Sequence, residues 1–416
     1  MNWLEILFGF AFFYPFCMAW LWMIGGLWFF FKREYSKQEL PKPSQHGCSI
    51  IIPCFNEEAQ VHQTIKYALQ TQYPEFEVIA VNDGSSDKTA EILNKLEQKY
   101  DRLRVVHLAT NQGKAIALRS GALVSKYEYL VCIDGDALLH PHAALWMMEH
   151  LTRYPRVGAV TGNPRILNRS SILAKLQVGE FSSIIGLIKR AQRTYGRIFT
   201  VSGVIVGFRK TALARVGFWS DDKITEDIDI SWKLQFDHWD IQYIPRALCY
   251  IYMPETFRGL WKQRLRWAQG GIEVLKEYLP KILKWRLRRM WMVAFESLIS
   301  IMWAYVMLLI FVLFFIGLIF PLPNALYIKS LLPHWYGAML GLTCLIQFLI
   351  SLWIDKRYDG NHRFIRNYFW VIWYPLFFWL LTTLTTICAV PKVLFQRKKR
   401  ARWVSPDRGF KGKRHD

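Results

Sequence analysis

Four long apolar runs interrupt an otherwise polar pattern along the chain. They cover residues 6–31, 297–328, 330–354 and 367–391, and none of them contains Asp, Glu, Lys or Arg. A membrane-spanning helix needs about 20 predominantly apolar residues, so each run is long enough to cross a bilayer. Lys32 and Arg33 follow the first run instead of preceding it, which favours a retained anchor over a cleaved signal peptide.

Between the first two runs, short apolar stretches alternate with amphipathic ones. The apolar stretches predict strands over residues 49–52, 78–83, 105–108 and 129–134, and the stretches between them predict helices over 57–70, 90–100 and 116–125. Strands that alternate with helices predict an α/β domain with a doubly wound, mostly parallel sheet. Polar residues follow the carboxyl ends of these strands, which is where open α/β sheets bind ligands.

The patterns divide the chain into five segments. We expect a transmembrane anchor over residues 1–34, a cytosolic α/β domain over 48–254, interfacial helices over 255–291, transmembrane segments over 292–395 and a basic tail over 396–416. Basic residues beside spans favour the cytosol, which places Lys32, Arg33 and the loop over 356–366 on that side. Four simple spans would then put the basic tail outside, so the sequence leaves open whether one segment is re-entrant.

The net charge of +21 is concentrated beside the apolar runs. Residues 258–289 hold ten basic and two acidic side chains, and residues 396–416 hold nine basic and two acidic ones. Such clusters are typical of a cytoplasmic membrane face that meets anionic lipid. No nucleic-acid recognition motif accompanies them, so we exclude nucleic acid as a partner. The seven cysteines form no CxxC pair, which argues against a zinc site or a disulfide framework.

Three acidic positions and one lysine follow predicted strands. Asp134 and Asp136 flank Gly135, and such a carboxylate pair suits Mg²⁺ or Mn²⁺ on a nucleotide diphosphate, although the same string occurs in ordinary turns. Asp83 ends a strand and can accept hydrogen bonds from a uracil or a ribose, or simply cap a turn. Lys114 offers a cation to the diphosphate, or is a surface loop residue.

Two further strings lie later in the chain. Thr225-Glu226-Asp227 supplies a carboxylate that can take a proton from an incoming hydroxyl, although a solvated helix start would look similar. In the string QRLRW, Gln263, Arg266 and Trp267 are spaced i, i+3, i+4 and so share one helical face. Trp offers a flat surface for a sugar ring, and Gln and Arg can bond hydroxyls or phosphate. The same helix is also typical of an amphipathic segment on lipid.

The order of these motifs resembles that of the processive family-2 glycosyltransferases with the GT-A fold, which include cellulose, chitin and hyaluronan synthases. Residues 201–209, 224–235 and 253–271 are most similar to the branch that makes poly-β-1,6-N-acetylglucosamine, the biofilm polysaccharide of bacteria. The resemblance covers the α/β domain and the helix after it, and the flanking apolar runs agree in placement.

The resemblance implies a role for each motif. It implies that Asp227 is the catalytic base with Glu226 in support, and that Asp136 is the metal ligand with Asp134 against the nucleotide and beside the metal. The remaining implied contacts are to the uridine, for Pro53, Asn56, Glu57 and Asp83, and to the acceptor end, for Ser202 and Gly203 together with Gln263, Arg266 and Trp267.

The resemblance also implies the reaction. UDP-N-acetylglucosamine is the expected donor, and direct displacement by the 6-hydroxyl of the growing chain inverts the anomeric carbon to give a β-linked polymer. We expect a multi-pass protein of the bacterial cell (inner) membrane that helps to export its product. Because four spans give little wall for a polysaccharide pore, we also expect a small transmembrane subunit, with cyclic-dinucleotide control at the shared surface.

Two alternatives stay open from the sequence. One is a related synthase of a chitin-like, hyaluronan-like, other β-linked or lipid-linked sugar. The other is a non-enzymatic transporter with a bound nucleotide domain, which leaves the strings TED and QRLRW unexplained and lacks a Walker A string.

Overall fold

The computed structural model describes residues 3–36, 39–328, 330–331, 334–359, 364–396 and 400–402. The chain folds as two compact units, which we describe separately. The sheet unit comprises Ser36–Phe181, Gly196–Leu260 and Arg397–Asp416. The helical unit comprises Met1–Tyr35, Ser182–Tyr195 and Trp261–Gln396, so a short segment from within the α/β region belongs with the apolar helices.

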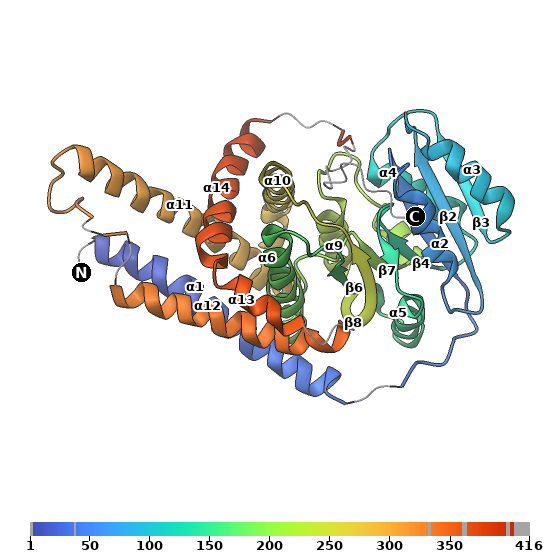
Figure 1. The fold of residues 1–416 in the computed structure, drawn as a ribbon, viewed down its shortest axis with the longest axis horizontal. Coiled ribbons are helices and arrows are strands. Elements are labelled where there is room, and N and C mark those ends of the chain that lie inside the picture. Colours follow the sequence, from blue (N-terminus) through green and yellow to red (C-terminus); the bar gives the residue numbers. More distant parts are fainter. Residues whose placement is uncertain are drawn as a thin grey trace. The chain divides into compact units, whose positions relative to one another are not determined.

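The sheet unit is built on eight strands in the order β3-β2-β1-β4-β7-β6-β8-β5 (Figure 1). The first four pair in parallel, as does β6 with β8, whereas β7 runs antiparallel to both β4 and β6, and β5 to β8. The strands are β1 (Cys48–Cys54), β2 (Phe76–Asp83), β3 (Leu103–Leu108), β4 (Tyr129–Ile133), β5 (Leu138–Leu139), β6 (Val157–Ile166), β7 (Ile205–Arg209) and β8 (Asp240–Ile251).

Helices lie between the strands, and three of them, α2, α3 and α4, appear where the alternating pattern predicts them. They are α2 (Val61–Leu69), α3 (Thr89–Lys99), α4 (Lys114–Val124), α5 (Ala143–Arg153), α6 (Ile172–Glu180), α8 (Lys210–Arg215) and α9 (Glu226–Phe236). Helix α4 packs closely on the sheet because Gly121 has no side chain: a Cβ there would lie 2.6 Å from Ile51 and 3.2 Å from Val81. Buried Ile79, Val81 and Ala117 form a hydrophobic cluster under the same helix.

The sheet topology predicts a ligand-binding crevice at its centre. The crossovers run outward from β1 through β2 to β3, and then return past β1 to β4. At such a reversal the loops after the strands separate, and ligands of open α/β sheets bind there. Asn56 and Asp136 lie in the loops after β1 and β4, and Asp83 ends β2, so three of the expected site residues lie at this edge of the sheet. The expected α/β fold is therefore confirmed, with an antiparallel β7 that the sequence did not predict.

Among the described residues of the helical unit, four helices are long and apolar enough to cross a membrane: Trp3–Glu34, Trp285–Ile319, Trp335–Tyr358 and Phe377–Phe395. In Figure 1 they correspond to α1 (Trp3–Phe29) with its π-helical end η1 (Phe30–Glu34), α11 (Trp291–Ile319) after η3 (Trp285–Met290), α12 (His334–Asp355) with η4 (Lys356–Tyr358), and α14 (Tyr374–Phe395). The remaining elements are η2 (Phe181–Leu187), α7 (Ile188–Tyr195), α10 (Phe257–Ile282), η5 (Phe364–Asn367) and α13 (Tyr368–Val371).

Helix α7 packs closely against α1 through two glycines. A Cβ on Gly25 would lie 2.6 Å from the Tyr195 ring, and one on Gly26 would lie 2.3 Å from Leu187. The carbonyl oxygens of α1 also accept hydrogen bonds from α7: Thr194 donates to Gly25 O and Tyr195 to Leu21 O. The segment Ser182–Tyr195 is thus built into the helical unit by close packing and by polar contacts.

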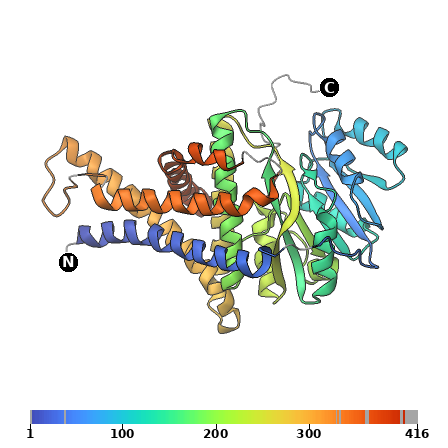
Figure 2. The same ribbon diagram turned by 60° about the horizontal axis from the view of Figure 1, so that its bottom comes forward.

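Helix α14 runs across α1 and α12 rather than beside them, as both views show (Figures 1 and 2). At its beginning, Tyr374 packs on Phe348, two turns before the end of α12. At its end, Ala389 and Val393 pack on Ile272 of α10 and near Ile301, about three turns into α11. The beginning of α14 therefore lies near the Asp355 end of α12, and its end lies against α10 and near the first half of α11.

A buried charge cluster joins three parts of the helical unit. The guanidinium of Arg190 on α7 donates to Glu34 at 2.7 and 3.1 Å and forms an ion pair with Asp355 at 3.1 Å. Tyr358 donates to the second Glu34 oxygen at 2.6 Å, and Arg357 donates to the backbone oxygen of Glu34. The side chains of Glu34, Arg190 and Asp355 are each at most 3% exposed. The ends of α1 and α12 are therefore clamped together on one side of the unit.

Candidate active site

Asp83 lies at the carboxyl end of β2 and is fully buried. Its two carboxylate oxygens accept the backbone N–H groups of Gln112 and Gly113 at 2.7 and 2.8 Å. Burial raises the pKa of Asp83 above its ordinary value, although these N–H groups and the charge of Arg400 act in the opposite direction. Asp83 thus holds the loop before α4 against β2, a position that its expected role at the nucleotide did not include.

The loop after β1 is pinned to the loop after β2. Asn56 has a left-handed backbone (φ 53°), and its side-chain oxygen accepts the Ser86 N–H at 2.8 Å. The Glu57 N–H donates to Thr89 at 2.8 Å, and the Glu57 side chain is buried. Pro53, at the end of β1, pairs with Val81 of β2. The structure therefore brings together the residues expected at the uridine.

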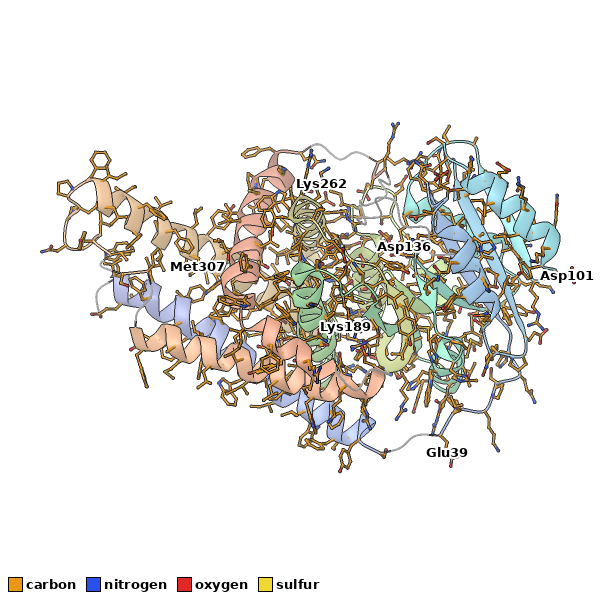
Figure 3. The ribbon with its side chains drawn as sticks, viewed as in Figure 1. Glu39, Asp101, Asp136, Lys189, Lys262 and Met307 are labelled. Carbon is orange, nitrogen blue, oxygen red and sulfur yellow. The ribbon has the colours of Figure 1, made fainter. Side chains whose placement is uncertain are left out.

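The DGD turn follows β4 directly, and Asp136 lies past the carboxyl end of that strand (Figure 3). A Cβ on Gly135 would lie 2.7 Å from Pro53 O, so only glycine lets the turn lie this close to β1. The Gly135 carbonyl accepts the Thr64 hydroxyl of α2 at 3.0 Å. The turn is thus fixed from two sides, while Asp134 and Asp136 stay partly exposed.

Lys114, the first residue of α4, joins two of the expected acidic sites. Its amino group lies 2.6 Å from Asp134 Oδ1 and 2.8 Å from Glu226 Oε1, and it donates to Gly203 O at 3.4 Å. Burial alone would lower the pKa of Lys114, but the charges of Asp134 and Glu226 raise it above its ordinary range, so the amine is charged. The sequence led us to expect a contact with the diphosphate and gave no sign of this bridge.

Asp227 lies in the first turn of α9, next to the loop that precedes β7. Its Oδ2 accepts the Gly203 N–H at 3.3 Å, and a Cβ on Gly203 would lie 3.0 Å from the same oxygen. The Ser202 N–H donates to Thr161 of β6 at 2.8 Å, which fixes the loop to the sheet. Ser202, Gly203 and Asp227 therefore form one local cluster, as the acceptor and base assignments require.

Gln263, Arg266 and Trp267 lie on α10 in the helical unit. The Gln263 side-chain oxygen is buried and accepts no hydrogen bond from the described residues. The neighbouring Arg264 stacks on the Trp267 ring, with its guanidinium carbon 4.3 Å from the ring centroid. The sequence did not predict a cation on this aromatic surface.

The chain near residue 400 lies at the edge of the sheet unit where Asp83 holds its loop. The Arg400 guanidinium hydrogen-bonds to the Gln112 side chain and lies 3.3 Å from Asp221, and the Ala401 N–H donates to Asp221 O. A Cβ on Gly113 would meet Ala401 O, so this approach requires glycine. We interpreted the basic tail as lipid-facing, and nothing in its local pattern indicates this contact. Residues 397–399 and 403–416 lie outside the described part.

The DGD turn could hold a divalent cation with one or two carboxylates, whereas the described residues offer no site in which protein side chains alone surround the metal. Among the described residues, no three His, Cys, Asp or Glu side chains come together as a metal site. Mg²⁺ is commonly held by one or two carboxylates, with phosphates and water in the other positions. The partly exposed carboxylate of Asp136, on a rigid turn, fits that kind of site.

Comparison with known proteins places the chain. Residues 46–270 match the family described as "Glycosyltransferase like family 2". The chain belongs to glycosyltransferase family 2. It is 41% identical, over 97% of its length and 98% of the relative's, to the poly-β-1,6-N-acetyl-D-glucosamine synthase of Staphylococcus epidermidis. It is 39% identical to the synthase of the same name from Staphylococcus aureus, with 97% and 98% of the two chains covered.

A solved structure shares the fold of this family 2 glycosyltransferase. The mannosyltransferase PcManGT from Pyrobaculum calidifontis, solved with GDP-Man and Mn²⁺, superposes with a TM-score of 0.58 at 17% identity, over 94% of this chain and 97% of that one. Likeness at this level concerns the fold alone. The expected family and the GT-A fold with apolar helices are confirmed, whereas the roles of individual site residues stay predictions.

Proposed function

We propose that this protein is a membrane-bound, processive, inverting glycosyltransferase that polymerises N-acetylglucosamine from UDP-N-acetylglucosamine into β-1,6-linked poly-N-acetylglucosamine for a biofilm matrix. The observation that carries the proposal is the likeness to synthases of this polymer over nearly the whole length of both chains. The Lys114–Asp134–Glu226 bridge next to Asp227 and Gly203 supports it, because one local cluster then serves both donor and acceptor.

On the donor side, Pro53, Asn56, Glu57 and Asp83 would hold the uridine in the crevice between β1, β2 and β4. Asp136, with Asp134, would hold the divalent cation, Mg²⁺ or Mn²⁺, against the diphosphate. When bound, such a cation stabilises the negative charge that develops on the leaving UDP. Lys114 bridges Asp134 and Glu226, so its positive charge offsets the repulsion between the two carboxylates beside the donor.

On the acceptor side, Asp227 acts as general base. The 6-hydroxyl of the terminal sugar attacks C1 of the donor and passes its proton to the Asp227 carboxylate, while the bond from C1 to the UDP oxygen breaks. This single displacement turns an α-linked donor into a β-linked product. Ser202 and Gly203, fixed by Thr161 and Asp227, position the acceptor end. Gln263, Arg266 and Trp267 of α10 would bind the chain terminus and the diphosphate.

We propose three crossings, by α1, α11 and α12, with α14 lying in the plane of the membrane near the cytosolic face. The clamp of Arg190 on Glu34 and Asp355 puts the ends of α1 and α12 on one side. Both ends of α14 pack near that same side, and Lys276 of the charged helix α10 donates to Val393 O. The loop at 356–366 and the tail are then both cytosolic, which removes the conflict in the charge pattern.

The small number of membrane crossings also supports a small transmembrane partner. Three crossings offer even less wall for a polysaccharide than four, and unsatisfied polar groups in hydrocarbon cost several kcal/mol each. We place the protein in the bacterial cell (inner) membrane with its sheet unit in the cytosol, and control by a cyclic dinucleotide at the surface shared with the partner. Long, fully translocated polymer made at normal rate in vesicles by a demonstrated monomer would contradict the need for a partner.

Radiolabelled UDP-N-acetylglucosamine given to membranes that contain the chain tests the reaction. We expect incorporation into a chitinase-resistant polymer with 1,6-linkages, and none in membranes that carry Asp227→Asn. UDP-glucose and UDP-glucuronic acid serve as competing donors. A chitinase-sensitive product, or a requirement for a second UDP-sugar, would instead assign the chain to a chitin-like or hyaluronan-like synthase.

A further inference from the structure

Polar and aromatic side chains face each other along the contact between α1 and α11. Trp22 of α1 hydrogen-bonds to Glu296 of α11. About one turn further along α11, Ser300 hydrogen-bonds to Tyr14 of α1. Further along, the Trp303 ring lies 6.4 Å from the Tyr14 ring. Glu296, Ser300 and Trp303 are spaced i, i+4, i+7, so they lie on one face of α11. We call these five side chains the polar seam.

One contact at the end of the polar seam has a purely structural explanation. Pro15 lies inside α1 and has no N–H, so the Ala11 carbonyl loses its helical partner. The Trp303 indole N–H donates to that oxygen at 3.0 Å. A carbonyl in hydrocarbon needs such a partner, and this contact supplies it.

Unlike Trp303, Glu296 is not explained by a need to hydrogen-bond a free backbone group. Its carboxylate is surrounded by neutral donors: the Trp22 indole, and the side-chain amide of Gln192 on α7 at 3.4 Å. It lies about one and a half turns inside a helix that is otherwise long and apolar. An acidic side chain at the start of an apolar span is costly to bury, and such residues typically mark a path for a polar substrate. A leucine would pack between these helices without that cost.

Other faces of α11 carry exposed apolar side chains, in contrast to the polar seam. Phe295, next to Glu296, is 64% exposed, and Met302, two residues beyond Ser300, is 49% exposed. Both side chains are apolar, as a lipid-facing surface requires. None of the five side chains of the polar seam is fully buried, so each keeps surface for another molecule. The side chains on α11 thus divide into an apolar face for lipid and a polar one for something else.

The chemistry of the polar seam matches that of a sugar chain. Hydroxyl groups of a hexosamine donate to carboxylate oxygens, its acetamido group bonds to amide and hydroxyl groups, and the apolar face of the ring lies on Trp or Tyr. We propose that the polar seam, together with Gln192, binds N-acetylhexosamine units of the growing polymer as they enter the membrane. The inference rests on the proposed function and assigns residues to the export that accompanies it.

Photo-crosslinking tests the inference directly. We would place p-benzoylphenylalanine, one position at a time, at Ser300 and Tyr14 in the polar seam and at Phe295 and Met302 on the apolar face. Each variant is supplied with radiolabelled UDP-N-acetylglucosamine in membranes, illuminated, and assayed for label on the protein. Ser300 and Phe295 differ by five positions and lie at similar depth, so they form a matched pair.

We expect label on the Ser300 and Tyr14 variants and none on the Phe295 and Met302 variants. Equal label on both faces, or none on the polar seam while polymer is made, would overturn the inference. Polymer synthesis is measured in every sample, so a failure of the proposed function is seen separately. If another UDP-sugar proves to be the donor, the same four variants are labelled with that sugar, and the same two outcomes decide.

Product length gives a second measurement. Glu296→Gln replaces the acid by an amide of the same shape, whereas Phe295→Leu changes an adjacent lipid-facing side chain. The amide offers sugar hydroxyls one acceptor oxygen in place of two, so we expect Glu296→Gln to shorten the product about tenfold and Phe295→Leu to leave it unchanged. Products of equal length from both variants would contradict a role for Glu296 in holding the polymer.

Discussion

Lys114 forms a 2.8 Å ion pair with Glu226, which joins the first residue of α4 to the first residue of α9. The same amino group lies 2.6 Å from Asp134 in the DGD turn. One cation therefore holds together the two acidic motifs that the sequence presents as separate strings, and it does so beside the loop of Gly203. The geometry of the site therefore depends on Lys114, which bridges two of its acidic side chains and the Gly203 loop.

Replacing Lys114 by Met should damage both stability and activity. It removes the charge that bridges Asp134 and Glu226, and because the pair is only partly buried the cost should fall below the roughly 3–5 kcal/mol of a fully buried pair. We expect a lower thermal unfolding temperature and loss of most turnover, measured on detergent-purified protein. Lys114→Arg, which keeps the charge, should recover much of the stability. A stable, active Lys114→Met variant would show that the bridge is dispensable.

Asp227→Asn should abolish most polymerisation while leaving UDP binding nearly intact. The amide cannot take the proton of the incoming hydroxyl, and loss of a general base typically lowers the rate about 10²–10⁴-fold. Radiolabel incorporation measures turnover, and calorimetry measures UDP affinity. Asp101→Asn, at an exposed position far from the crevice, is the control (Figure 3). Near-normal turnover by folded Asp227→Asn would reject the assignment of the base.

Asp136→Ala should abolish turnover and should weaken UDP binding only when Mg²⁺ or Mn²⁺ is present. The reason is that the cation links this carboxylate to the phosphates, so its removal costs affinity only through the metal. UDP titrations with metal and with excess chelator measure the difference. Full activity of the unmodified protein in chelator would contradict metal dependence.

Arg400→Gln should move the acidic limb of UDP binding to higher pH. The pKa of Asp83 is already raised by burial, and the positive charge of Arg400 lowers it. Removing that charge raises the pKa further, so between the two values Asp83 is protonated in the variant and ionised in the unmodified protein. The window lies above 3.8, the ordinary pKa value, and the UDP affinities of the two proteins should converge at pH values above both Asp83 pKa values.

The control for this pH shift is Arg402→Gln, which removes an exposed charge from the same segment. Stability should change in the opposite direction: a raised carboxyl pKa contributes stability below its ordinary value that is lost as pH rises through the folded value, so Arg400→Gln should lose more stability than the unmodified protein as pH rises. Identical binding curves for both variants from acid to neutral pH would show that Arg400 does not act on Asp83.

Arg190→Met should destabilise the helical unit more than Arg190→Lys does. The change leaves Glu34 and Asp355 buried without a cation, which costs about 3–5 kcal/mol. Lysine restores the charge but not the two parallel hydrogen bonds to Glu34. Thermal unfolding in detergent measures the order of the three proteins. If Arg190→Met unfolded at the same temperature as the unmodified chain, the clamp would contribute no stability.

The parts of this fold that follow local patterns could be predicted from the sequence. Strands β1 to β4 and helices α2 to α4 appear where the alternation places them, because their faces are set by short-range periodicity. The antiparallel pairing of β7 could not be predicted, since it depends on which distant edge is free. The direction of α14 was also hidden: an apolar run reads the same whether it crosses the membrane or lies within it.

The candidate site also contains residues that the sequence could predict and residues that it could not. Motif spacing located Asp83, Asp136 and Asp227 at strand and helix ends, and the structure brings them to one region of the sheet unit. The bridging role of Lys114 and the contact of Arg400 with Gln112 arise from residues far apart in the sequence. No local pattern distinguishes such cations from the many others in a chain with a net charge of +21.

The clamp around Arg190 has a consequence for how the protein is made. Glu34 leaves the ribosome early, Arg190 much later, and Asp355 near the end of synthesis. Glu34 therefore has no ion pair with Arg190 until that residue has been synthesised. Glu34 and Arg190 can form a neutral pair as soon as α7 docks on α1. The second carboxylate joins only when α12 has been inserted. The helical unit can therefore be completed only after translation has passed Asp355 and Tyr358, and a chain interrupted before that point would leave α1 without its last partners.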